Sequence, residues 1–330
     1  MPVSAADIVA LPFDNQYALA GVQYARDSLH YTYNRMDLTT AARLRKIVAG
    51  VAFEMAFRRW LETYDVSYNL LGATHFTERD RYDLVLGGRR CDLKSFLLRN
   101  KQIIRTVSNN PGWLLDAVAL VPVDQIKSTH LGPKDIYIFG FITGLEARSL
   151  ADTRKAHANG APGYLIHPLS AHKWARPRNW HNIGPLTIKS NARNVIQVEI
   201  GGLGLDRQLL REQVQLQPRV RTKLTNEYFS VLYLQSDAIP SGAIGLHSPV
   251  LKSTPVIEAH EWKNIWLYGR GVYLCGWMNK EEFRTKSKRL PPGSLTKQYR
   301  RTKTVNRALA ISELRPIEQL AELIKESGRR

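Results

Sequence analysis

Apolar residues recur with helical spacing between residues 41 and 61, in AARLRKIVAGVAFEMAFRRWL. Side chains three or four positions apart share one face of a helix, so this segment is predicted to be a helix with one apolar stripe. The stripe consists of Leu44, Ile47, Val51, Phe57 and Leu61. Glu54 falls within it, where a carboxylate is costly to bury without a partner. We therefore expect Glu54 either to pair with a cation such as Arg58 or to face a metal site.

The spacing changes to that of a hairpin in YDLVLGGRRCDLKSF, residues 82–96. Residues 82–86 alternate as a strand, Gly87 and Gly88 supply the turn, and residues 90–96 return as a second strand. A hairpin that closes on its glycines pairs its two arms directly. Side chains from both arms are therefore expected to approach one another.

This hairpin carries two carboxylates and an ammonium group. Side chains two positions apart on a strand share a face, so Asp92 and Lys94 are expected to point the same way. Asp83 lies on the partner strand, within cross-strand reach. Carboxylate oxygens suit Mg²⁺ or Mn²⁺ rather than zinc, and Lys94 can orient or help deprotonate one of the waters that such an ion keeps. The pattern predicts a site for phosphodiester hydrolysis.

Two further apolar segments resemble each other, DIYIFGFI at residues 135–142 and GVYLCGWM at residues 271–278. We predict that they are neighbouring buried strands of one sheet. The chain then divides into a discontinuous core, formed by residues 1–149 and 263–330 with a basic arm and a helix at its C-terminal end, and an inserted module at residues 150–262.

The order of strand, turn and helix signals in the inserted module is typical of a mixed α/β or β-rich domain. Residues 195–200 and 228–234 are predicted strands, residues 201–202 a turn, and residues 206–213 a short helix. The module is expected either to recognise nucleic acid or to form a dimer.

At four positions the chain resembles the PD-(D/E)xK nuclease superfamily. That family's core is a helix with a glutamate, a β-hairpin with an aspartate followed by (D/E)-x-K, a further helix and another strand. The matching residues are Glu54, Asp83, Asp92 and Lys94, and the resemblance covers roughly residues 40–145. The proline that usually precedes the first aspartate is Tyr82 here, a difference that concerns backbone shape rather than ligand chemistry.

The resemblance implies an α/β fold, with a restriction-endonuclease-like mixed sheet flanked by helices, beside the additional basic module. It implies that Asp83 and Asp92, with Glu54, hold Mg²⁺ or alternatively Mn²⁺, that the backbone carbonyl near Leu93 adds a ligand, and that Lys94 assists the attacking water. It also implies products with a 5′-phosphate and a 3′-hydroxyl.

The charge of the chain favours a polyanionic substrate. It has 47 Lys and Arg residues against 29 Asp and Glu residues, a net charge of +18. Residues 1–150 contain 18 basic and 15 acidic residues, whereas residues 151–330 contain 29 and 14. Cationic surfaces bind nucleic acid through phosphate contacts and counterion release, so we expect most of the substrate contacts in the second half.

The densest basic run is residues 284–307, RTKSKRLPPGSLTKQYRRTKTVNR, which contains no acid. Pro291, Pro292 and Gly293 interrupt it, so a loop or arm between ordered elements is expected. The alternative is a solvated loop without a ligand; the basic second half favours phosphate contacts. The residues predicted to make them are Lys286, Lys288, Arg289, Lys297, Arg300, Arg301 and Lys303.

A second candidate surface interleaves cations and aromatics around residue 176. Lys173, Trp174, Arg176 and Arg178 are predicted nucleic-acid contacts, because aromatic rings stack on bases while cations hold the backbone. His167, His172 and His181 lie nearby, but their intervals fit no metal-binding pattern. We interpret them as surface, core or phosphate-contacting histidines.

Two cysteines, Cys91 and Cys275, are too few for a disulfide framework and favour a reducing compartment. No apolar run reaches the roughly 18 residues of a membrane span, and the N-terminal sequence lacks the basic start of a signal peptide. A cytoplasmic protein with no membrane partner is expected.

The leading functional hypothesis is a Mg²⁺-dependent DNA endonuclease of restriction or antiviral defence, which would cut duplex DNA as a homodimer or by two nicks. No GxxxxGK[ST] loop indicates an ATPase. Within the same fold, a repair, transposition or RNA-directed nuclease is the alternative. A different class is a nucleic-acid-binding protein that does not cleave, and a third is a structural or protein-interaction module, which would explain neither the hairpin acids nor the basic half.

Overall fold

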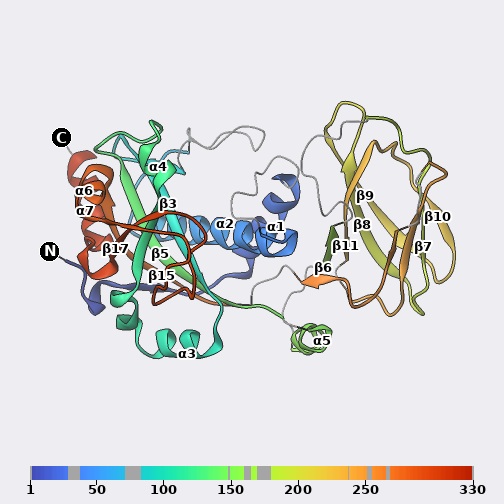
Figure 1. Cartoon of the computed structure of the whole chain (residues 1–330), viewed down its shortest axis with the longest axis horizontal. Coiled ribbons are helices and arrows are strands. Elements are labelled where there is room, and N and C mark those ends of the chain that lie inside the picture. Colours follow the sequence, from blue (N-terminus) through green and yellow to red (C-terminus); the bar gives the residue numbers. More distant parts are fainter. Residues whose placement is uncertain are drawn as a thin grey trace. The chain divides into compact units, whose positions relative to one another are not determined.

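The computed structural model describes residues 2–28, 38–70, 83–147, 149–159, 165–168, 180–236, 238–250, 255–264 and 268–328 (Figure 1). The chain forms two compact units. Unit 1 contains Met1–Gly21, Lys46–Leu145 and Leu267–Arg330, and unit 2 contains Val22–Arg45 and Glu146–Trp266. The expected division placed all of residues 1–149 in one domain, whereas the contacts group Val22–Arg45 with unit 2.

Unit 1 is built on a mixed five-stranded sheet with the order β1-β15-β5-β3-β2. Its strands are β1 (Val9–Leu11), β2 (Leu84–Leu86), β3 (Arg89–Leu98), β5 (Ile136–Leu145) and β15 (Tyr268–Asn279). β3 and β5 are parallel, and the other neighbours are antiparallel. The predicted pairing of the two apolar segments is confirmed, since β15 lies antiparallel to β5 along its whole length. The chain is therefore of the α/β class.

Helices cover both faces of this sheet, because β5 is apolar on both sides. Ile136, Ile138 and Ile142 belong to one core and Tyr137, Phe139 and Phe141 to the other. The first core contains side chains of α2 (Thr40–Thr63) and α7 (Ile317–Gly328). The second contains side chains of α3 (Lys101–Asn109) and α6 (Lys280–Lys286), together with the short elements η2 (Pro111–Asp116), α4 (Val123–Lys127) and η3 (Ile311–Glu313). A short helix near the N-terminus, η1, covers Ala5–Asp7.

The predicted helix at residues 41–61 is confirmed as α2, but its buried stripe differs from the expected one. Val48, Ala52, Phe53, Ala56 and Trp60 are buried, together with Leu44, Phe57 and Leu61. Ile47, Val51 and Glu54 are only half-buried, at the border of this face. Small alanines let α2 lie close to the sheet. The face of α2 that packs against the sheet is therefore rotated by about one residue from the face that carries Ile47 and Val51.

The basic segment 284–307 is an ordered hairpin rather than a free arm. β16 (Lys288–Leu290) pairs with β17 (Asn306–Ala310), which pairs with β4 (Val118–Pro122). Gln298 anchors the connecting loop, since its side-chain amide donates to the Val118 carbonyl at 2.7 Å and accepts from the Val118 amide at 3.2 Å. Backbone hydrogen bonds between Thr302 and both Gly293 and Ser294 tie the loop to itself.

Unit 2 contains two antiparallel sheets, of five and four strands, that enclose one core. The larger sheet has the order β14-β6-β11-β8-β9 and the smaller β10-β7-β12-β13. The bounds are β6 Leu165–Pro168, β7 Thr187–Ser190, β8 Ile196–Leu203, β9 Leu209–Leu216, β10 Arg221–Lys223, β11 Ser230–Ser236, β12 Ile244–His247, β13 Val256–Ile257 and β14 Lys263–Asn264. One helix, α5 (Leu150–Ala158), precedes the first of these strands. Of the two descriptions expected for this module, β-rich is the accurate one.

Two local predictions in unit 2 are wrong. The segment predicted as a helix, residues 206–213, forms a turn and then β9, which pairs with β8 over its whole length. The glycines predicted as a turn, Gly201 and Gly202, lie inside β8. A Cβ atom at Gly201 would lie 2.2 Å from the Tyr233 ring, and one at Gly202 would lie 2.5 Å from the Tyr228 ring. These glycines make room for aromatic rings rather than for a reversal of the chain.

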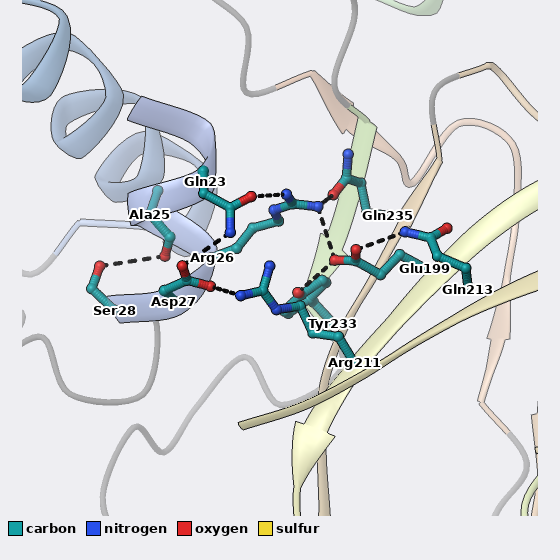
Figure 2. Close-up of polar contacts among 10 residues, drawn as sticks. All are labelled: Gln23, Ala25, Arg26, Asp27, Ser28, Glu199, Arg211, Gln213, Tyr233 and Gln235. Carbon is teal, nitrogen blue, oxygen red and sulfur yellow. Dashed lines mark hydrogen bonds and ion pairs between the residues drawn. The ribbon is translucent and has the colours of Figure 1, made fainter. Parts of the chain in front are cut away.

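A polar network attaches the C-terminal part of α1 (Asn15–Ser28) to the five-stranded sheet of unit 2 (Figure 2). The Arg26 Nη1 group donates to Glu199 at 2.9 Å and to Gln235 at 2.5 Å. Glu199 also accepts from the Tyr233 hydroxyl at 2.8 Å and from the Gln213 amide at 2.7 Å. The buried carboxylate therefore has partners on both oxygens, as stability requires. This network explains why the C-terminal part of α1 belongs to unit 2.

Candidate active site

The β2–β3 hairpin brings together the acids and the lysine that the sequence singles out. Asp83 immediately precedes β2, and its amide donates to the Cys91 carbonyl at 2.9 Å. The reversal is made by Gly87 and Gly88, whose φ angles of 51° and 74° are in the left-handed region that glycine adopts without strain. The predicted turn is confirmed.

The Asp83 carboxylate crosses to the middle of the D-x-K triplet. One of its oxygens accepts a hydrogen bond from the Leu93 amide at 2.5 Å. Leu93 separates Asp92 from Lys94, so this bond fixes the first acid beside the other two candidate residues of the hairpin. Asp83, although it lies just outside β2, is thus held against the middle of β3.

Asp92 and Lys94 lie on the same face of β3, as predicted. The Lys94 ammonium lies 2.5 Å from an Asp92 carboxylate oxygen, with side chains 12% and 20% exposed. The same ammonium lies 5.9 Å from the centroid of the Tyr137 ring, a cation–π distance. Tyr137 is the register partner of Asp92 on the parallel strand β5 and is fully buried. The aromatic ring therefore forms one wall around the lysine.

Glu54 satisfies the first expectation made for it. Its carboxylate lies 3.7 Å from the Arg58 guanidinium, one helical turn further along α2. Both side chains keep about a quarter of their surface or more, at 30% and 26% exposure. A pair of this kind contributes little to stability, so it leaves the carboxylate able to exchange partners.

The charges of these residues act on one another. Loss of solvation around Asp83, followed by the negative charges of Glu54 and Asp92, raises the pKa of the Asp83 carboxyl well above its usual range. The Lys94 ammonium and the Leu93 amide act in the opposite direction. The negative charges of two other acids thus act on Asp83, and a bound cation is favourable in such an environment.

The donor chemistry fits a hard divalent ion. Asp83, Asp92 and Glu54 offer carboxylate oxygens, the ligand type that Mg²⁺ and Mn²⁺ prefer. In the arrangement described, however, Lys94 and Arg58 occupy two of these acids. Within the described ranges, no group of three or more His, Cys, Asp or Glu side chains is arranged to hold a metal ion. Those two ion pairs would have to rearrange for all three acids to share one ion.

Two basic residues from other parts of unit 1, Arg99 and Lys303, lie near Lys46, which is eight positions before Glu54 on α2. Desolvation, and then the positive charges of Arg99 and Lys303, lower the pKa of the Lys46 ammonium. Lys46 remains accessible to solvent, so the neighbouring cations are the more telling cause. The sequence pattern pointed to Lys303 but not to Lys46 or Arg99, because those two lie outside the dense basic run of residues 284–307.

The cations predicted in the basic hairpin fall into two groups. Lys286 pairs with Glu282 at 2.8 Å, and Lys297 pairs with Asp116 and lies 4.8 Å from the Trp113 ring centroid. These two have structural partners. The remainder are exposed to solvent: Lys288, Arg289, Arg300, Arg301 and Lys303.

The second predicted surface, with Lys173, Trp174, Arg176 and Arg178, lies outside the described residues, as does His172. Trp180, at its edge, stacks on Phe229 with 5.6 Å between ring centroids, and the Arg207 guanidinium lies 4.6 Å from its centroid. The ring thus has partners within unit 2. The two cysteines, Cys91 and Cys275, are free and buried.

The described helices include none with the length and apolar character of a membrane span. Comparison of the chain with protein-family models, with curated proteins and with solved structures finds no match.

Proposed function

We propose that this protein is a Mg²⁺-dependent DNA endonuclease whose active site consists of Glu54, Asp83, Asp92 and Lys94. The observation that carries the proposal is the electrostatic coupling of the three acids around the hairpin, with Lys94 directly beside Asp92. The order of elements is consistent with it, because α2, the β2–β3 hairpin, α3 and the parallel strand β5 follow one another as in the PD-(D/E)xK nucleases that the sequence resembles.

Each residue has a chemical role in this proposal. Asp83 and Asp92, with Glu54, would hold Mg²⁺, which supplies charge neutralisation at the phosphate and a water of lowered pKa. Lys94 would orient the attacking water at Nζ and, once it has released its own proton to solvent, accept the proton of that water. Attack of the water oxygen on phosphorus breaks the bond to the 3′ oxygen. The products carry a 5′-phosphate and a 3′-hydroxyl.

The charge of the chain supports DNA as the substrate, since a protein of net charge +18 attracts a polyanion. The cations around Lys46 and those exposed on the basic hairpin would contact phosphates near the cut. Restriction or antiviral defence is the biological setting we propose, with a homodimer to cut both strands.

A second candidate function is binding of nucleic acid without cleavage. Its supporting observation is that Lys94 neutralises Asp92 while Arg58 lies beside Glu54, so cations of the protein occupy places where a metal would act. The arrangement of the three acids argues against this non-cleaving function. A half-buried acid whose pKa is raised by desolvation and by two other acids is an unfavourable feature that a binding surface does not need.

Plasmid cleavage distinguishes the two functions. Wild type, Asp92→Ala and Lys94→Ala are incubated with unmodified and modified DNA in Mg²⁺, Mn²⁺ or EDTA. We expect metal-dependent cutting by wild type and a loss of about 10²-fold or more in both variants, the usual scale for a general acid or base. Uncut DNA under every condition, with salt-sensitive binding retained, would favour the non-cleaving alternative.

A further inference from the structure

The smaller sheet of unit 2 has one face turned to solvent. In Figure 1, β7 and β10 lie on the side of the sandwich away from β6 and β11. Along β7 and β12, side chains alternate between core and surface: Ile188, Ile244 and Leu246 are buried in the core of the sandwich. The residues between them therefore form the outer face of the sheet.

The register of the strands places cations side by side on this face. Arg221 on β10 is directly opposite Lys189 on β7, and Lys189 is directly opposite Gly245 on β12. In the next outward row, Thr187 lies between Lys223 and His247. Arg221, Lys189, Lys223 and His247 are exposed to solvent. We call Lys189, Arg221 and Lys223 the cationic face.

This arrangement is unfavourable for the isolated protein. Like charges directly opposite on neighbouring strands have Cβ atoms about 5 Å apart and destabilise the pair. The two outward rows contain no acid, and no ion pair in the described part of the chain involves Lys189, Arg221 or Lys223. Arg219 adds a further exposed cation from a strained backbone position, with φ of 62°.

We propose that the cationic face binds the phosphate backbone of duplex DNA. The proposal rests on the proposed function, since it assigns to unit 2 a part of the substrate that the site in unit 1 would cut. Lys189 and Arg221 provide adjacent donors of fixed spacing, which suits recognition of phosphate oxygens. Gly245, next to Lys189, has no atom closer than 4.0 Å to where a Cβ would lie. A phosphate can therefore approach the backbone there.

Other occupants fit this face less well. A second copy of the chain, related by a two-fold axis through the face, would oppose the same cations to one another. An anionic membrane would favour apolar side chains among the cations. The outward rows offer only Val256, at the edge strand β13. DNA needs neither a complementary acidic surface on this chain nor apolar anchors.

Binding of a fluorescently labelled short duplex, measured by anisotropy in EDTA over a range of salt concentrations, tests the proposal. The triple variant Lys189→Gln, Arg221→Gln, Lys223→Gln is compared with a control that loses the same charge, Lys127→Gln, Arg154→Gln, Lys155→Gln, whose residues are exposed in α4 and α5. We expect the first variant to bind about tenfold or more weakly, with its salt slope reduced by roughly three, about one for each lost phosphate contact.

The control variant is expected to retain most of the affinity of wild type. Equal losses in both triple variants would overturn the proposal, because net charge alone would then explain binding. Wild type that does not bind duplex, or that prefers phosphatidylserine vesicles to it, would overturn the proposal as well. The thermal midpoint of the first variant should equal or exceed that of wild type, since its substitutions remove a repulsive pair.

The metal-free assay separates this proposal from the nuclease proposal. Repeating it in the Asp92→Ala background keeps cleavage out of the measurement. Wild type that cleaves no DNA in Mg²⁺ or Mn²⁺ but binds it through the cationic face would leave the cationic face supported and the nuclease proposal refuted. Cleavage by wild type that does not change when the cationic face is neutralised, at salt concentrations where binding limits the rate, would support the nuclease proposal and refute the role of the cationic face.

Discussion

Asp83 is the residue on which the chemistry of the proposed site depends most. Its carboxyl has a raised pKa because it is desolvated and because Glu54 and Asp92 lie near it. In the folded protein its proton is therefore held to a higher pH than in the unfolded chain. The contribution of Asp83 to stability is most favourable at low pH, and it is lost as the pH rises from the ordinary carboxyl range through the raised pKa.

Asp83→Asn should consequently stabilise the metal-free protein while abolishing cleavage. The amide oxygen can still accept from the Leu93 amide, but no charge is placed beside the two remaining acids. Denaturant unfolding in EDTA from about pH 4 to about pH 8 should show wild type losing stability relative to the variant as the pH rises. Parallel pH profiles for the two proteins would contradict the account of this carboxyl.

The sequence alone singled out the four candidate residues but not the partners that they have in the folded protein. Alternation along β3 sufficed to place Asp92 and Lys94 on one face, and the glycine turn sufficed to bring Asp83 to them. The ion pairs of Asp92 with Lys94 and of Glu54 with Arg58 depend on side-chain rotamers. The wall formed by Tyr137 depends on the pairing of β3 with β5, whose partner residues lie 45 positions further along the chain, so that no local pattern predicts it.

At the scale of elements, prediction succeeded where one periodicity dominated. The helix α2 and the strands β5, β8, β11 and β15 lie where the apolar pattern placed them. Prediction failed where the same residue types occur in two kinds of structure. Gly201 and Gly202 resemble a turn in sequence but lie in a strand under tyrosine rings. The segment 206–213 forms a turn and then the first part of β9, a strand with one solvated face.

The role of the glycines in β8 can be tested directly. In Gly201→Ala, the added methyl group would lie 2.2 Å from the Tyr233 ring, so overpacking should cost about 1–3 kcal/mol of the free energy of unfolding. Gly50→Ala is the matched control. Gly50 lies in α2 with no neighbour within 4 Å of a Cβ, and alanine should stabilise that helix by about 0.5–1 kcal/mol. Equal effects of both substitutions on denaturant unfolding would refute the close packing of β8.

At the scale of the whole molecule, the proposals divide chemistry and part of the substrate binding between the two units. Unit 1 contains the acids, and unit 2 contains the cationic face. The sequence showed the excess of basic residues in its second half, but it could not show the cationic face. Lys189 and Arg221 are far apart in the chain, and only strand register makes them neighbours.

This division predicts that cleavage and binding can be lost separately. Lys94→Ala should bind duplex DNA in EDTA within about threefold of wild type, since Lys94 is mostly buried beside Asp92 and contributes little to the surface field. The same variant should cut at least about 10²-fold more slowly in Mg²⁺. A parallel fall in affinity and rate would mean that Lys94 acts in binding rather than in chemistry.

The central claim is that acids from α2 and the β2–β3 hairpin act together on one divalent ion. The most direct test is Mn²⁺ titration followed by electron paramagnetic resonance, in the presence of a duplex made resistant to cleavage. Wild type and the control Asp116→Asn, an exposed acid 75% accessible, should each bind an ion that Asp83→Asn and Asp92→Asn do not. Binding that is the same in all four proteins, or absent from wild type, would contradict the account.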